Sequence, residues 1–257
     1  MSDSTRHPVR FVFVEPRYGG NVGAAARVLK NFGFDRLDVV APREGPDHEE
    51  AVRMAVDAVD VLRAARTHAT LDEALDGAAT VVGASRRMGK HRQPHHRLGE
   101  LAPLLPGLTV RGEVAMVFGR EDHGLSDADL DRCTHLIYVP THAAYPALNV
   151  AQAIAIVAYE VRGALDASEL DATASPDPED EALVDHAGRE AMYAHLEQAL
   201  LTIGFLKVGQ LEGMMRRLRR ILSRAELTAG DVDVVRGIAR QILWLSRQAG
   251  LDPRKRT

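Results

Sequence analysis

The sequence has a single cysteine and no long hydrophobic run. Cys133 alone cannot form an intrachain disulfide or build a thiolate metal cluster, and a buried packing role is the commoner outcome for such a residue. No stretch approaches the roughly 18 consecutive apolar residues of a membrane span, and the first residues, MSDSTRHPVR, lack the apolar core of a signal peptide. These absences predict a cytoplasmic protein with no membrane segment.

The net charge of −4 gives no overall sign of nucleic-acid binding, but the basic residues are unevenly distributed. One cluster, SRRMGKHRQPHHRLGE, directly follows a predicted strand, and a second, MMRRLRRILSRAEL, falls on a predicted helix. Each cluster can be a solvated surface or a set of phosphate contacts. Two such clusters in a net acidic chain favour an RNA or phosphate partner.

Predicted strands and helices alternate through the first part of the chain. Apolar runs predict strands at 9–15, 37–42, 79–85, 113–119 and 135–140, and helical spacing predicts helices at 21–32, 49–65, 71–78, 127–133 and 149–165. Such alternation is typical of a doubly wound α/β fold, with a mostly parallel sheet covered on both faces.

The composition changes after this region. Residues 166–181 are rich in Asp, Glu, Ser and Pro, which predicts a solvated linker. Helical patterns follow at 181–199, 206–225 and 231–248. We therefore expect an α/β domain at 1–165, an acidic linker at 166–181 and a small helical domain at 182–257.

The segment GGNVGAAAR joins the first predicted strand to its helix. It fits neither the dinucleotide fingerprint nor the Walker loop. The helix start could still present backbone N–H groups to an anion, with Asn21 at the turn and Arg27 further along. An equally plausible alternative makes Arg27 an ordinary surface residue.

Two further segments place polar residues beside strand ends. In VFGREDHGLSDADL a strand ends at Gly119, and Glu121 lies between it and Gly124, where ligands bind in open α/β sheets. Glu121 could equally be an exposed turn carboxylate, and His123 lacks the paired spacing of a zinc site. Asn149 opens a helix so apolar that the sheet or another subunit must bury it.

Taken together, NVGAAAR, VFGREDHGLS and IYVPTHAAYPALNVAQAIAIVAYE resemble, in order and spacing, the three motifs of SPOUT-class (TrmH/SpoU-like) RNA ribose 2′-O-methyltransferases. The helical C-terminal region narrows the resemblance to the TrmJ type. The resemblance implies methyl transfer from S-adenosyl-L-methionine to a ribose 2′-hydroxyl of tRNA, at nucleotide 32 of the anticodon loop. It also implies a deep trefoil knot, a homodimer and a reaction that requires no metal.

The family's functional residues transfer to matching positions of this chain. The resemblance implies catalytic roles for Asn21, Arg27, Glu121 and Asn149, with Glu121 able to hold Arg27. It implies cofactor contacts at three strand-end loops: Ala84, Ser85, Arg86, Gly119, Gly124, Val139, Pro146, Ala147 and Leu148. The basic clusters give the predicted RNA contacts Arg87, Lys90, Arg92, Arg97, Arg216, Arg217 and Arg220.

One position departs from the family pattern. Most relatives carry serine immediately before the Leu-Asn pair of the third motif, where this chain has Ala147, which cannot donate a side-chain hydrogen bond. Two alternatives stay open beside tRNA methylation, and Ala147 motivates only the second of them. The first is 2′-O-methylation of another RNA such as rRNA, and the second is a catalytically weak RNA-binding protein.

Overall fold

The computed structural model describes residues 8–86, 95–170, 181–206 and 208–249. Its centre is a seven-stranded sheet in the order β3-β2-β1-β6-β4-β7-β5. The strands are β1 (Val9–Val14), β2 (Leu37–Val40), β3 (Arg66–His68), β4 (Ala78–Ala84), β5 (His95–Arg97), β6 (Glu113–Phe118) and β7 (His135–Tyr138). All neighbouring strands pair in parallel, which confirms the predicted parallel α/β sheet.

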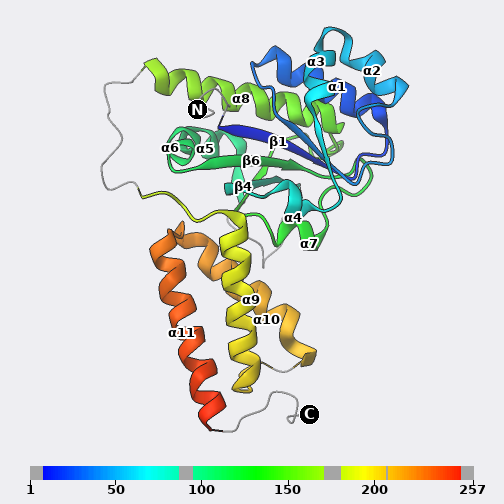
Figure 1. Ribbon diagram of the computed structural model, residues 1–257. Helices are drawn as coiled ribbons and strands as arrows, with labels where there is room; N and C mark the ends of the chain where they lie inside the picture. Colours follow the sequence, from blue (N-terminus) through cyan, green and yellow to red (C-terminus); the bar gives the residue numbers. More distant parts are fainter. Residues whose placement is uncertain (1–7, 87–94, 171–180, 207, 250–257) are drawn as a thin grey trace.

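Helices cover both faces of the sheet (Figure 1). Phe11 and Phe13 of β1 face one apolar core, while Val12 and Val14 of the same strand face the other, as alternation along a strand requires. The first core contains α1 (Gly19–Asn31), α2 (Glu49–Ala55), α3 (Val59–Ala64), α5 (Leu98–Leu101), α6 (Leu105–Val110) and α8 (Val150–Leu170). The second contains α4 (Leu71–Ala74) and α7 (Asp127–Leu130).

Several elements differ from those predicted from the sequence. The helix expected at 49–65 is broken, because Val56 has a φ of +52° and a 3₁₀ turn, Val56–Ala58, separates α2 from α3. Helix α8 continues to Leu170, so residues 166–170 are helical rather than linker; residues 166–168 are exposed, and their composition suits a helix end as well as a linker. Strands β3 and β5 were missed because they are short, partly exposed edge strands without an apolar run.

Three helices follow the acidic segment, most of which lies outside the described residues. They are α9 (His186–Thr202), α10 (Leu211–Leu222) and α11 (Ala229–Gln248), and they enclose an apolar cluster that includes Met192, Tyr193 and Met215. Helix α9 begins later than predicted because Asp185 accepts a hydrogen bond from the Gly188 N–H and caps it. No described helix is long and apolar enough to cross a membrane.

The C-terminal helices contact the sheet at the start of α9 and extend away from it (Figure 1). The buried Arg189 guanidinium donates hydrogen bonds to the carbonyl oxygens of Ala79 in β4, at 2.6 Å, and of Val184, at 2.5 Å. His186 contacts Asp72 of α4 at 2.8 Å. Polar bonds to the body of the protein therefore fix the orientation of α9.

Candidate active site

A cavity of about 270 Å³ lies at the carboxyl ends of β4, β6 and β7. All nine residues predicted to contact the cofactor line it: Ala84, Ser85, Arg86, Gly119, Gly124, Val139, Pro146, Ala147 and Leu148. Three loops that are distant in sequence meet there because neighbouring parallel strands end at one edge of the sheet. The structure thus brings these positions together, and their contact with a cofactor stays a prediction.

The turn after β6 depends on two glycines. A Cβ added at Gly119 would lie 2.2 Å from both the Gly124 carbonyl carbon and the Leu125 nitrogen, so the backbone closes on itself there. Gly124 has a φ of +69°, in the left-handed region that favours glycine. This tight turn places Phe118, Arg120 and Leu125 around the cavity. The cavity combines apolar walls with a few polar groups, which suits a small organic cofactor.

The polar residues predicted to be catalytic form a chain beside this cavity. The Asn21 amide donates a hydrogen bond to a Glu121 carboxylate oxygen at 2.9 Å, and the Asn149 amide donates one to Asn21 Oδ1 at 3.1 Å. Glu121 also accepts the backbone N–H of Arg17 at 3.0 Å. The three motifs therefore meet through direct side-chain contacts, and Glu121 fixes the segment that leads into α1.

Arg27 lies apart from this chain. It is exposed on α1, and no hydrogen bond or ion pair joins it to any described residue. The expectation that Glu121 holds Arg27 finds no support in this arrangement, because Glu121 is directed to Asn21 and to the backbone of residues 17 and 18. The Arg27 side chain is accordingly accessible to a ligand.

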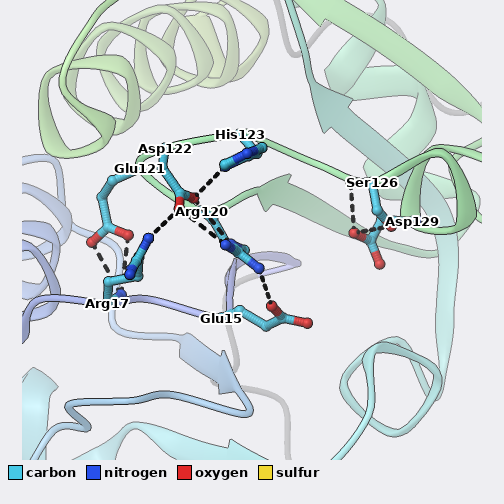
Figure 2. Close-up of polar contacts among 8 residues, drawn as sticks. All are labelled: Glu15, Arg17, Arg120, Glu121, Asp122, His123, Ser126 and Asp129. Carbon is cyan, nitrogen blue, oxygen red and sulfur yellow. Dashed lines mark hydrogen bonds and ion pairs between the residues drawn. The ribbon is translucent and has the colours of Figure 1, made fainter.

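Four charged residues beside the cavity were not singled out from the sequence. Arg120 donates two hydrogen bonds to Asp122, both at 3.0 Å, and one to Glu15 at 3.1 Å. Arg17 contacts the same Asp122 carboxylate (Figure 2). The hydrogen bond from Arg120 holds the pKa of Asp122 well below its usual range. The alternation of charges in GREDH was the available signal, but it does not specify which charges meet.

The predicted RNA-binding residues divide into three groups. Arg87, Lys90 and Arg92 lie outside the described residues. Arg97, Arg217 and Arg220 have side chains with no hydrogen bond or ion pair to another described residue. Arg216 instead donates to Asp131 at 3.0 Å and to Glu212 at 2.9 Å, so it links α10 to the loop after α7. The segment predicted to be a basic loop also contains the short strand β5.

Two other sequence features can be placed. Cys133 is buried, as expected for a packing cysteine, and burial raises the pKa of its thiol. Ala147 lines the cavity, where the neighbouring hydroxyl of Thr141 donates to the Pro146 carbonyl oxygen at 3.1 Å. Within residues 8–86, 95–170, 181–206 and 208–249, no group of three or more His, Cys, Asp or Glu side chains could hold a metal ion.

Comparison with known proteins gives two family matches. The model of the SpoU rRNA Methylase family matches residues 8–159, and that of the tRNA methyltransferase TrmJ C-terminal domain matches residues 188–253. The first match spans the sheet and the cavity. The second spans most of α9 and all of α10 and α11.

Named relatives align over nearly the full length. The tRNA (cytidine/uridine/adenosine-2′-O-)-methyltransferase TrmJ of Pseudomonas aeruginosa (strain UCBPP-PA14) is 37% identical, over 93% of this chain and 95% of the relative. The tRNA (cytidine/uridine-2′-O-)-methyltransferase TrmJ of Citrobacter koseri is 37% identical, over 91% and 96% respectively. The crystal structure of TrmJ from Z. mobilis ZM4 has a TM-score of 0.77 at 29% identity, covering 91% of this chain and 98% of that one.

Proposed function

The chain belongs to the SpoU rRNA methylase family, in its TrmJ group, and is an RNA methyltransferase; we propose that it methylates a ribose 2′-hydroxyl of tRNA with S-adenosyl-L-methionine as methyl donor. The observation that carries the proposal is the strand-end cavity joined to the Glu121–Asn21–Asn149 chain. A cofactor pocket and a polar nucleotide-facing edge are thereby adjacent, as transfer between two bound molecules requires.

The cavity residues fit the proposed cofactor. The cavity volume of about 270 Å³ approaches the size of common cofactor sites, and Gly119 leaves room only for backbone at the turn. Ser85 and Arg86 supply polar groups, while Phe118 and Leu125 supply apolar wall. When bound, S-adenosyl-L-methionine supplies an electrophilic methyl group on a sulfonium. The reaction would join the 2′-oxygen to that carbon and break the carbon–sulfur bond, which leaves a neutral thioether, while the hydroxyl proton passes to water.

We assign different roles to the polar residues. Asn21 and Asn149 orient the nucleotide. Glu121 accepts the Asn21 amide and Asn21 accepts the Asn149 amide, so both side chains are fixed in position. Arg27 binds the adjacent phosphate and stabilises negative charge that develops on the 2′-oxygen. A guanidinium is protonated at neutral pH, so we do not assign proton removal to it.

The tRNA substrate is proposed from the named relatives. They are tRNA 2′-O-methyltransferases, and this chain aligns with nearly their whole length. We propose domain boundaries at 1–165 and 182–257, with the second domain binding tRNA. Arg217 and Arg220 of α10 support this role because their guanidinium groups have no ion pair within the described part of the chain. Nucleotide 32 is the proposed target.

We further propose a trefoil knot and a homodimer. Strand β5 precedes β7 in the chain yet lies beyond it in the sheet, which is the strand order that a threaded C-terminal segment would produce. Helix α8 buries Ile154 and Val157 in the core but leaves Ile156 37% and Tyr159 64% exposed. An apolar helix face open to solvent supports a second copy of the chain covering it.

Labelled methyl transfer tests the function directly. The full chain is incubated with total RNA and S-adenosyl-L-methionine labelled in the methyl group, and the labelled RNA is separated by size and digested with nucleases. We expect label in tRNA as a 2′-O-methyl nucleotide. Label confined to rRNA would support that substrate instead, and cofactor binding without any transfer would favour the catalytically weak alternative.

Deletion of the gene tests which tRNA nucleotide the protein methylates. We expect the 2′-O-methyl group at nucleotide 32 to disappear from tRNA of the deletion strain and to return on complementation with the intact gene. Loss at another nucleotide would refute the assignment to position 32 while leaving the proposed reaction standing.

A further inference from the structure

Four charged side chains connect the two loops that carry the motif residues. Figure 2 shows Arg120 between Glu15 and Asp122, with Arg17 on the other side of the Asp122 carboxylate. Glu15 and Arg17 follow β1, whereas Arg120 and Asp122 follow β6, the strand paired with β1. We call Glu15, Arg17, Arg120 and Asp122 the charge clamp. It spans neighbouring strand ends more than 100 positions apart in sequence.

Two residues of the clamp, Arg120 and Asp122, flank Glu121 in the sequence. Arg120 and Asp122 hold side chains of the first loop, while Glu121 between them accepts N–H groups from that loop's backbone, from Arg17 at 3.0 Å and Tyr18 at 3.4 Å. The same carboxylate accepts the Asn21 amide. Any shift of one loop against the other would therefore move Glu121 relative to Asn21 and, through it, Asn149.

Arg120 is the centre of the clamp. Its guanidinium makes a two-bond contact with Asp122 and uses its remaining Nη1 atom for Glu15. A planar guanidinium can hold two carboxylates in fixed directions, which a lysine ammonium on a flexible chain cannot do. Glu15 also has a φ of +47°, and its backbone N–H donates to the Val40 carbonyl oxygen at 2.8 Å, so its position is set by the sheet. The clamp thus transmits the position of β1 to the loop after β6.

We propose that Arg120 is a positioning residue for methyl transfer: through Glu15 and Asp122 it fixes Glu121, and thereby the Asn21–Asn149 pair, against the cofactor cavity. This inference rests on the proposed function and extends it to residues that lie outside the polar chain itself. An exposed ion pair adds little to stability. Its effect on catalysis can be larger, because a displacement of about 1 Å in a catalytic group can lower a rate on the order of a hundredfold.

The test is a mutant cycle in the full-length chain with R120A, E15Q and the double variant. We expect R120A to lower kcat about tenfold and E15Q about threefold, with KM for tRNA and Kd for S-adenosyl-L-methionine changing less than about threefold. The double variant should be no slower than R120A, since both changes release the same contact. R120K should have a kcat less than about twofold above that of R120A, because a lysine cannot make the three hydrogen bonds of Arg120 to Asp122 and Glu15.

Two outcomes overturn the proposal. One is a kcat of R120A or E15Q within about twofold of the unaltered chain. The other is a large rise in cofactor Kd for R120A with E15Q unaffected, which would mean that Arg120 acts by binding the cofactor. R53A is the matched control, because Arg53 also forms an exposed ion pair, with Glu50, but lies on α2 away from the cavity. It should leave kcat unchanged.

Hydrogen exchange separates this inference from the proposed function. R120A should speed exchange of the Arg17 and Tyr18 amides, which Glu121 holds in the intact clamp, while the amides of β2 stay protected. Unchanged exchange at residues 15–21 would overturn the clamp even if the enzyme methylates tRNA. If the unaltered chain transfers no methyl group, the proposed function fails and exchange still tests the clamp.

Discussion

Single residues decide which charges at the active site are available to substrate. Glu121 accepts hydrogen bonds from the Asn21 amide and from the backbone N–H of Arg17. The arginines of the charge clamp are paired with carboxylates. Arg27 on α1 is exposed and has no ion pair within the described residues. A cation without an internal ion pair can bind an incoming anion without first breaking such a contact.

Replacing Arg27 by lysine tests whether its guanidinium matters. We expect Arg27→Lys to retain tRNA binding within about threefold but to lower kcat at least about tenfold, because a lysine ammonium cannot donate two directed hydrogen bonds. Methyl-transfer rates at saturating tRNA and cofactor provide the measurement. Near-normal transfer would exclude a guanidinium-specific role, and Arg53→Lys on α2 serves as the control.

At the level of elements, the contact between α9 and β4 depends on one buried side chain. Arg189 of α9 is 7% exposed and donates hydrogen bonds to the carbonyl oxygens of Ala79 in β4 and of Val184, which precedes α9. Removing it would leave those carbonyl oxygens buried without donors, which costs more than the loss of an exposed hydrogen bond. The position of α9, and with it that of α10, is therefore set by polar groups as well as by the apolar cluster of the C-terminal helices.

The substitution Arg189→Ala measures this contact. We expect it to lower the free energy of unfolding by at least about 2 kcal/mol, because buried acceptors lose their partners. Urea unfolding followed by circular dichroism gives the value. Arg247→Ala, at an exposed position on α11, should change it by less than about 0.5 kcal/mol. Equal effects of the two substitutions would contradict the role of Arg189.

Strand β7 contributes a pH dependence. Burial, reinforced by the nearby His96, lowers the pKa of His135 to about 4. A histidine whose pKa is lower in the folded chain contributes full stability above its unfolded pKa of about 6.5 and loses it as the pH falls towards 4. We expect the free energy of unfolding to decrease over this range, by at most about 3 kcal/mol from His135.

Urea unfolding at pH 7, 5.5 and 4 checks the sign of this effect. His135→Gln should reduce the slope. Some slope will remain, because burial also lowers the pKa of His186, which acts in the same direction. Identical slopes for His135→Gln and the unaltered chain would show that His135 does not carry the effect.

At the level of the whole molecule, two surfaces are proposed to meet other macromolecules. One is the apolar side of α8, where Ile156 and Tyr159 are open to solvent. The other is the basic side of α10, which keeps Arg217 and Arg220 available while Arg216 is used in a contact with Asp131. The first is chemically suited to a protein surface and the second to phosphates.

A charge on α8 tests the proposed homodimer. Because a carboxylate would be desolvated in an apolar interface, we expect Ile156→Asp to shift the protein from dimer to monomer. Light scattering coupled to size-exclusion chromatography gives the mass. Val110→Asp, at a 60% exposed position at the end of α6, should leave the mass unchanged. A chain that is monomeric without substitution would refute the dimer.

Removing two cations from α10 tests the proposed tRNA surface. We expect Arg217→Ala with Arg220→Ala to weaken tRNA binding about tenfold or more at low salt and to reduce the salt dependence of binding, since fewer counterions are released. Filter binding at several salt concentrations measures both. Arg236→Ala with Arg240→Ala on α11 provides a control with the same loss of charge. An equal effect in the control would contradict a specific α10 surface.

The sequence by itself determined the parallel α/β sheet, the loops at which the site lies and the helical C-terminal region. These depend on local apolar periodicity and on glycine, which act over a few residues and are visible in order along the chain. The broken helix at Val56 and the short strands β3 and β5 left no such local signal. Their conformations follow from contacts with distant segments.

Only the tertiary structure decided which charges pair. The sequence showed acidic and basic residues near Glu121 but could not direct Glu121 to Asn21 rather than Arg27, or commit Arg216 to Asp131. It also gave no sign that Glu15, directly after β1, would meet Arg120, which follows β6. Ion pairs form across whichever strands the fold makes neighbours, so side chains far apart in sequence acquire their partners only when the sheet assembles.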